Sequence, residues 1–76
     1  MEDLVRSIVL ALVDNPDEIS VKTVEKEGET ILELRVAASD MGKVIGKQGR
    51  IAKAIRVVVK AAGAKENKNV GVEIVQ

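Results

Sequence analysis

Apolar positions in the first half of the chain follow a helical pattern and then an alternating one. Residues 2–13 carry apolar side chains at helical spacing, namely Leu4, Val5, Ile8, Val9, Ala11 and Leu12. This spacing predicts an amphipathic helix that ends before Pro16, because proline disfavours helical geometry in the preceding residue. Alternation over residues 19–23 and 32–36 predicts two half-buried strands, with Gly28 in the turn between them. The strands should pair as an antiparallel hairpin whose outer, largely charged face meets water.

Two glycines interrupt the pattern in the second half. Ser39 or Asp40 can cap a short helix, since their side-chain oxygens accept hydrogen bonds from free N–H groups in a first helical turn. We expect this helix to last only about two turns, because Gly46 and Gly49 follow and glycine is unfavourable inside a helix.

The remaining periodicity predicts a long helix and a last strand. Residues 50–62 are typical of a helix ended by Gly63, and residues 70–74 alternate as a third strand. The element order is therefore α-β-β-α-α-β. Three helices against one face of a three-stranded sheet make a two-layer α+β domain, and we expect residues 1–76 to form one such domain.

Composition excludes several classes of function. The chain has no Phe, Tyr or Trp, so it has no aromatic platform for stacking, and it has no Cys or His. These absences remove disulfides, the usual zinc sites, thiol nucleophiles and imidazole acid–base chemistry. No cofactor motif or paired carboxylates stand out, and we expect a non-catalytic protein without cofactor or metal. The N-terminal apolar run is too short for a membrane span and has no basic start, so we expect a cytoplasmic protein that does not bind membranes.

Charge is strongly segregated along the chain although the net charge is zero. Residues 1–40 hold four Lys or Arg against ten Asp or Glu, and residues 41–76 hold eight against two. Seven basic residues and no acidic residue lie between Met41 and Lys65. Such asymmetry is typical of a polyanion-binding face. The alternative is that the two halves simply attract each other in the fold.

The basic half contains the stretch GKVIGKQGR, residues 42–50. Gly46 and Gly49 allow a sharp turn that exposes backbone N–H groups and lets a sugar–phosphate backbone approach closely. A helix begins here, so its positive dipole end points to the same place, and Lys47 and Arg50 add full charges. The spacing matches neither a P-loop nor a dinucleotide-binding fingerprint. It predicts a phosphate-binding turn, with an ordinary helix–helix turn as the alternative.

The long helix after this turn has a basic face and a broad apolar face. The basic side chains are Arg50, Lys53, Arg56 and Lys60. Because no acid interrupts them, they favour a nucleic-acid groove over an ordinary solvated exterior, which usually mixes signs. The apolar side chains expected against the sheet are Ile51, Ile55, Val59 and Ala62. Four more extend beyond that stripe, namely Ala54, Val57, Val58 and Ala61. They are either covered by the first helix or form a dimer interface.

The segment SDMGKVIGKQGRIAKAIR resembles the RNA-binding segment of KH domains, in which a GxxG loop lies between two helices. The predicted element order is similar to the type II arrangement of that fold, and the resemblance covers all 76 residues. Within KH proteins, the chain resembles the bacterial KhpA (YlqC-like) family of stand-alone single-KH, RNA-binding proteins. One departure is Ile51, where many members have a Thr that could help to cap the helix.

The resemblance implies a division of labour around the loop. In KH domains about four nucleotides cross the GxxG loop and its surroundings. The glycines of the loop would contact phosphates, basic side chains would supply charge, and Val44 and Ile45 would form an apolar floor under the bases. Arg56, a further turn along the helix, would be a peripheral contact. The implied RNA-binding residues are Lys43, Val44, Ile45, Gly46, Lys47, Gln48, Gly49, Arg50, Lys53 and Arg56.

The resemblance also implies a role and partners. Family members are similar to small RNA chaperones or post-transcriptional regulators that bind single-stranded RNA, and single-stranded DNA is the other candidate ligand. They self-associate as homodimers or form heterodimers with a larger KH protein of the Jag (KhpB) type. The alternative function is a protein–protein adaptor of KH fold that dimerises through its long helix and binds little RNA. The absence of acids beside Lys47 and Arg50 favours RNA binding.

Overall fold

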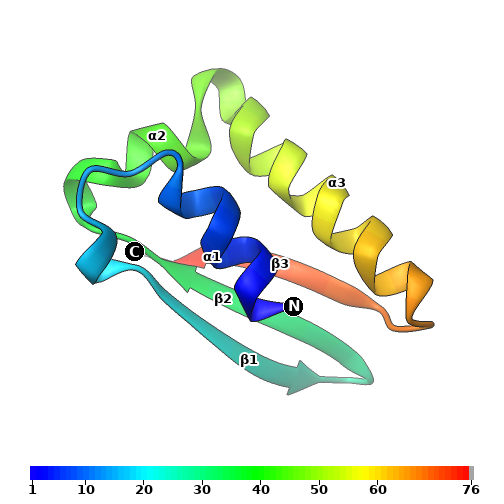
Figure 1. Ribbon diagram of the computed structural model, residues 1–76. Helices are drawn as coiled ribbons and strands as arrows, with labels where there is room; N and C mark the ends of the chain where they lie inside the picture. The colour runs from blue at the N-terminus through cyan, green and yellow to red at the C-terminus, as the bar shows by residue number, and fades with distance from the viewer. Residues whose placement is uncertain (76) are drawn as a thin grey trace.

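The computed structural model describes residues 1–75 and shows a three-stranded sheet with helices on one face (Figure 1). The helices and strands are α1 (Glu2–Leu10), β1 (Ser20–Lys26), β2 (Glu29–Arg35), α2 (Met41–Ile45), α3 (Arg50–Lys65) and β3 (Val70–Val75). Three single turns of 3-10 helix lie at Pro16–Glu18, Ala38–Asp40 and Lys47–Gly49. The predicted α-β-β-α-α-β order and the α+β class are confirmed.

The sheet is built around β2, which pairs antiparallel with β1 and parallel with β3. The predicted hairpin is present, and its two-residue loop consists of Glu27 and Gly28, both with positive φ. Such a loop matches the twist of the flanking strands. The parallel pairing of β2 with β3 requires a long crossover, and α2, the glycine turn and α3 provide it. The glycine turn therefore lies within this connection.

The core between sheet and helices is aliphatic, as the composition requires. Alternate positions of β2 point inward, where Leu32 and Leu34 are almost completely buried. The outer face of the sheet is largely charged, but Ile31 is an exception and is buried on that face between Val24 and Gly71 of the neighbouring strands. The core cluster comprises Val5, Val9, Ile19, Val21, Leu32, Leu34, Val44, Ile55, Val59, Val70 and Val72.

Several predicted element ends differ from the structure in the first half of the chain, including the start of β2, which is Glu29 rather than residue 32. The first helix ends at Leu10 rather than at residue 13. Its last turn tightens, because the N–H of Leu12 bonds to the carbonyl of Val9 at 2.9 Å, a 3-10 bond. Strand β1 extends to Lys26, beyond the predicted residue 23, because the hairpin ladder continues to the tight loop.

The prediction that Gly63 ends the long helix is wrong. Helix α3 continues to Lys65, and Gly63 is buried against the start of β3. A Cβ atom at Gly63 would lie 2.7 Å from Cγ2 of Val70, so glycine is required by close packing. The helix actually ends in the left-handed conformation of Asn67, after which the N–H of Lys68 bonds to the carbonyl of Gly63 at 2.9 Å.

Helix α3 packs on the sheet through a narrower face than its sequence suggested. Ile55 and Val59 are buried as predicted, whereas Ile51 and Ala62 are only half-buried. Ala52 is buried as well, although the apolar pattern did not single it out. Ile51 nevertheless packs against the core cluster, whereas Ala52 is not part of that cluster.

Candidate nucleic-acid interface

A sharp turn joins α2 to α3 and has the sequence Gly46-Lys47-Gln48-Gly49. The backbone φ angle is 75° at Gly46, 56° at Gln48 and 72° at Gly49. A Cβ atom at Gly46 would lie 2.3 Å from Cγ1 of Ile51, so this position requires glycine for space as well as for conformation. The two glycines thus allow a turn that other residues would resist.

The turn presents hydrogen-bond donors and positive charge to solvent. The side chains of Lys47 and Gln48 are exposed. The positive end of the α3 dipole lies at the same place, although the N–H of Arg50 bonds to the carbonyl of Lys47 and that of Gly49 to the carbonyl of Gly46 at 3.2 Å. Arg50, at the start of α3, donates from Nη2 to Oε1 of Gln48 at 3.3 Å, which keeps the guanidinium beside the turn. The positive end of a helix together with cations favours a bound phosphate.

Positive charge continues from the turn along α3. Lys53, Arg56 and Lys60 are all exposed. Arg56 donates from Nε to the carbonyl oxygen of Val72 at 3.3 Å. Because β3 is an edge strand whose other side pairs with β2, this bond brings the guanidinium to the free edge of the sheet. A groove of about 300 Å³ between α3 and β3 is lined by Glu29, Arg56, Lys60, Asn69, Val70, Gly71 and Val72.

The two apolar residues expected beneath the bases occupy different depths. Val44 is completely buried and belongs to the core, so it supports the surface from below. Ile45 is half-buried and is the one of the two that reaches the surface beside the turn. Of the two, only Ile45 is therefore accessible from the surface.

Lys43 differs from the other basic residues near the turn because its charge is already paired. Its ammonium donates to the exposed carboxylate of Asp14 and lies 3.6 Å from Oδ1 of Asp40. The hydrogen bond to Asp14 raises the pKa of Lys43 above its ordinary value, against the opposing effect of partial burial. Lys43 therefore contributes less free positive charge to the surface than Lys47 does.

The prediction that Ser39 or Asp40 caps the short helix is wrong. Within the described chain neither side chain bonds to an N–H group of α2. The carboxylate of Asp40 instead accepts from the N–H of Asp14 at 3.1 Å and from the N–H of Asn15 at 3.0 Å. The side-chain amide of Asn15 donates to Asp40 at 3.1 Å and to Ser39 Oγ at 3.3 Å. Both side chains thus serve the distant segment that follows α1.

These contacts keep Asp40 charged. The hydrogen bond from the Asp14 N–H is the largest cause that lowers the pKa of Asp40, and burial opposes it only in part. The partners lie 25 and 26 positions earlier in the chain. Neither periodicity nor a local motif could have shown this contact, because nothing near Asp40 in the sequence marks its partners.

A stripe of apolar side chains on α3 is left exposed, namely Ala54, Val57, Val58 and Ala61. Val57 is 63% exposed and Val58 is 45% exposed. The interpretation that the first helix covers these residues is therefore wrong. Between the two helices an apolar groove of about 380 Å³ remains open, lined by Leu4, Ile8, Leu12, Ile51, Ala54, Ile55 and Val58.

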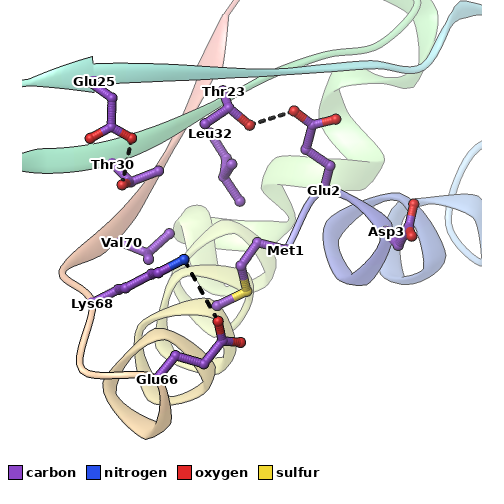
Figure 2. Close-up of a pocket in the computed structure, with 10 residues that line it drawn as sticks. All are labelled: Met1, Glu2, Asp3, Thr23, Glu25, Thr30, Leu32, Glu66, Lys68 and Val70. Atoms are coloured by element: carbon purple, nitrogen blue, oxygen red, sulfur yellow. Dashed lines mark hydrogen bonds and ion pairs between the residues drawn. The ribbon is translucent and has the colours of Figure 1, made fainter.

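A further hollow, of about 440 Å³, lies at the other end of β2 beside the hairpin and the start of α1 (Figure 2). Thr23 donates to Glu2 across it, and Thr30 donates to Glu25 at 2.8 Å. Its charged side chains are mostly acidic, namely Glu2, Asp3, Glu25 and Glu66 against Lys68. This end repels a polyanion, whereas the end with the glycine turn attracts one.

A metal site and a membrane-spanning helix are both absent from the part of the chain that the structure describes. Residues 1–75 contain no group of three or more His, Cys, Asp or Glu side chains arranged to hold a metal ion. Over the same residues, no helix has the length and apolarity needed to span a bilayer.

Sequence comparisons identify the family. The KH-domain model described as "KhpA/KhpB, KH domain" matches residues 2–74. The chain belongs to the KhpA/KhpB family. The fold described above is consistent with this KH family, and the GxxG turn lies where the resemblance placed it.

Similar curated proteins extend over the whole chain. RNA-binding protein KhpA of Clostridium acetobutylicum is 63% identical over 75 residues, and that of Clostridium perfringens is 61% identical over 75, each covering 99% of this chain and 100% of the relative. The Bacillus subtilis protein of the same name is 54% identical over 74 residues, 97% of this chain and 91% of the relative. These names describe RNA binders rather than enzymes, in agreement with the non-catalytic expectation. No solved structure gives a significant match.

Proposed function

We propose that this protein binds single-stranded RNA by gripping the phosphate backbone with the Gly46–Gly49 turn and the adjacent basic face of α3. One observation carries the proposal. The turn holds Gly46 and Gly49 at positive φ. It lies at the positive end of the sixteen-residue helix α3, and the exposed charged side chains of α3 near the turn are all basic. The relatives named as RNA-binding proteins support the same ligand.

The proposed division of labour follows from where each group lies. Phosphates sit at the turn, where the positive end of α3 and the side chains of Lys47, Gln48 and Arg50 converge. Lys53 and Arg56 extend the positive charge along the proposed path of the RNA strand. The bases rest on Ile45, which Val44 supports from below. The edges of the bases form hydrogen bonds with polar groups of the neighbouring protein surface. Aliphatic contacts replace aromatic stacking, because the chain has no aromatic residue.

Lys43 is proposed as a weaker contact than the others. Its ammonium is shared with Asp14 and Asp40, so a phosphate must compete with two carboxylates for it. With roughly three to four phosphates neutralised by the remaining groups, one domain binds with modest affinity. Dimerisation would increase the affinity for longer RNA through effective concentration.

The cellular role is proposed from the family alone. We propose a small RNA chaperone or post-transcriptional regulator in the cytoplasm. This role fits a single KH domain of this size that binds single-stranded RNA. Its proposed protein partners are a second copy and a larger KH protein of the KhpB type, whose name the matching family shares. The exposed apolar stripe of α3 is the surface available for either partner.

The test replaces the positive charge of the turn with negative charge. Lys47→Asp with Gln48→Asp places two carboxylates where phosphates are proposed to sit, and we expect binding of labelled short single-stranded RNA at low salt to be lost. The matched control, Lys65→Asp with Asn67→Asp, makes the same change in net charge at exposed positions at the far end of α3 and should retain most binding. Circular dichroism checks that both variants are folded.

Three outcomes separate the candidate functions. Binding by native protein and control, with loss in the turn variant, supports the proposal. Equal binding by all three proteins would mean that the basic helix acts nonspecifically and the turn is not a phosphate grip. No binding by the native protein would favour the adaptor of KH fold, for which the open apolar stripe on α3 is the supporting observation.

A further inference from the structure

Asp40 is the only charged side chain within residues 1–75 that is buried; its exposed fraction is 1%. Burying a carboxylate is costly unless it is hydrogen-bonded. Asp40 receives three hydrogen bonds, from the N–H groups of Asp14 and Asn15 and from the side-chain amide of Asn15. A fully satisfied buried charge of this kind fixes the relative position of the segments that it joins.

The two segments are the chain after α1 and the start of α2. Asp40 immediately precedes α2, whereas Asp14 and Asn15 lie in the connection between α1 and β1. On the next turn of the helix, Lys43 reaches back to Asp14, so the same two segments are tied twice. The turn that carries the proposed phosphate site is thereby connected to the segment between α1 and β1.

Helix α2 depends on such external contacts. It has only five residues, and an isolated helix of that length is unstable in water. Val44 buries one side of it in the core, and Asp40 holds its beginning. The end of α2 leads directly into the turn, because the N–H of Gly46 bonds to the carbonyl of Gly42 at 2.8 Å. A shift at the start of α2 therefore reaches the first glycine of the turn within about two helical turns.

We propose that Asp40 is a positioning residue for RNA binding: by anchoring the start of α2 to Asp14 and Asn15, it sets the position of the Gly46–Gly49 turn. The inference rests on the proposed function in so far as the turn binds RNA. Asp40 itself does not touch the ligand, since its carboxylate is buried and its oxygens are occupied by protein donors.

Whether removal of the Asp40 charge strengthens or weakens RNA binding distinguishes a positioning role from a purely electrostatic one. Both Asp14 and Asp40 lie beside Lys43 near a site for a polyanion. Removing either negative charge should strengthen RNA binding if charge alone matters. Removing the Asp40 carboxylate should weaken binding if Asp40 holds the turn in place. The exposed side chain of Asp14 provides the matched control, because it carries the same charge and contacts the same lysine.

The experiment compares Asp40→Asn with Asp14→Asn in titrations of a short single-stranded RNA oligonucleotide. We expect Asp40→Asn to weaken binding roughly tenfold, because an amide cannot accept hydrogen bonds on both of its ends and one N–H is left facing a donor. Asp14→Asn should bind as the native protein does or about twofold more tightly. Affinities are measured at a temperature where circular dichroism shows both variants folded.

Amide hydrogen exchange of the free proteins provides a readout that needs no RNA. In Asp40→Asn the N–H groups of Gly46 and Gly49 should exchange faster, while those of β2 change less, because the loosening is local. If Asp40→Asn does not fold, Asn15→Ala removes one donor to Asp40 without changing charge and should give the same pattern with a smaller effect.

Each outcome decides the matter. Weaker RNA binding together with faster exchange at Gly46 supports a positioning role. RNA binding by Asp40→Asn as tight as by Asp14→Asn overturns it. So does an equal rise in exchange over the turn and the sheet, which would show that Asp40 only stabilises the fold. If the native protein binds no RNA, the proposed function itself fails, and the exchange data then show only whether Asp40 holds α2.

Discussion

At the scale of single residues, Gly46 is the position on which the geometry of the turn depends most. Its φ of 75° and ψ of 176° lie in a region open essentially only to glycine. The neighbouring Ile51 fills the space where a side chain would start. Gln48 also has positive φ, but its left-handed helical conformation is available to other residues at a cost of about 1 kcal/mol. Gly46 is therefore a structural requirement, whereas Gln48 accepts moderate strain beside the proposed phosphate site.

The first prediction compares two glycines on either side of Ile45. Gly46→Ala should lower the free energy of unfolding by roughly 2–3 kcal/mol, since it combines backbone strain with a clash against Ile51. Gly42→Ala, in α2 where a Cβ meets nothing within 4 Å, should be neutral or stabilise the protein by up to about 1 kcal/mol. Urea unfolding of both variants measures the difference. Equal stability of the two would show that the turn adopts another conformation in solution.

The sequence predicted the residues of the turn but not all of their surroundings. GKVIGKQGR marks its own chemistry, because glycine and charge within a short stretch act locally. The local pattern predicts a capping role for Asp40, because its actual donors, Asp14 and Asn15, are distant in the sequence. Gly63 was assigned as a helix end for a similar reason, since the side chain of Val70 that excludes a Cβ there comes from β3. Residues whose roles depend on tertiary neighbours cannot be recognised from local pattern.

At the scale of elements, α3 has three faces with different surroundings. One face packs on the sheet through Ile55 and Val59, and the face toward β3 is basic. The third face, with Val57 and Val58, is apolar and exposed. Periodicity predicted the helix and its order among the elements, because a sixteen-residue segment averages over local exceptions. It could not decide how far α1 would cover the third face, which depends on the angle between two helices.

The second prediction concerns that third face. We expect the native protein to be a homodimer at micromolar concentration, and Val58→Asp to convert it to a monomer, because a buried carboxylate in the interface would lack a partner. Leu10→Asp is the matched control: Leu10 is 49% exposed, close to the 45% of Val58, but lies outside the groove between α1 and α3. Sedimentation equilibrium measures the mass. A monomeric native protein, or equal dissociation by both variants, would contradict this assignment.

At the scale of the whole molecule, the segregation of charge along the sequence becomes a segregation in space. The glycine turn lies toward the end of β2 that leads into α2, and the acidic hollow lies at the hairpin end (Figures 1 and 2). Helix α3 runs from the turn along β3, where Arg56 and Lys60 share a groove with Glu29. The basic side chains near the turn are mostly free of acids, with Lys43 as the exception. Attraction between the acidic first half and the basic second half of the chain accounts for the contacts of Lys43 near the turn. The other positive charges near the turn remain available to a polyanion.

The most direct test of the central claim is the salt dependence of RNA binding by the native protein. Each phosphate neutralised on a single strand contributes about −0.7 to the slope of log K against log salt concentration, so roughly three to four contacts predict a slope of about −2 to −3. Titrations of a short single-stranded RNA at several salt concentrations, repeated with Lys47→Asp plus Gln48→Asp, measure it. A slope in this range for the native protein, with binding lost in the variant, is the predicted result. A slope near zero would contradict a phosphate-gripping turn.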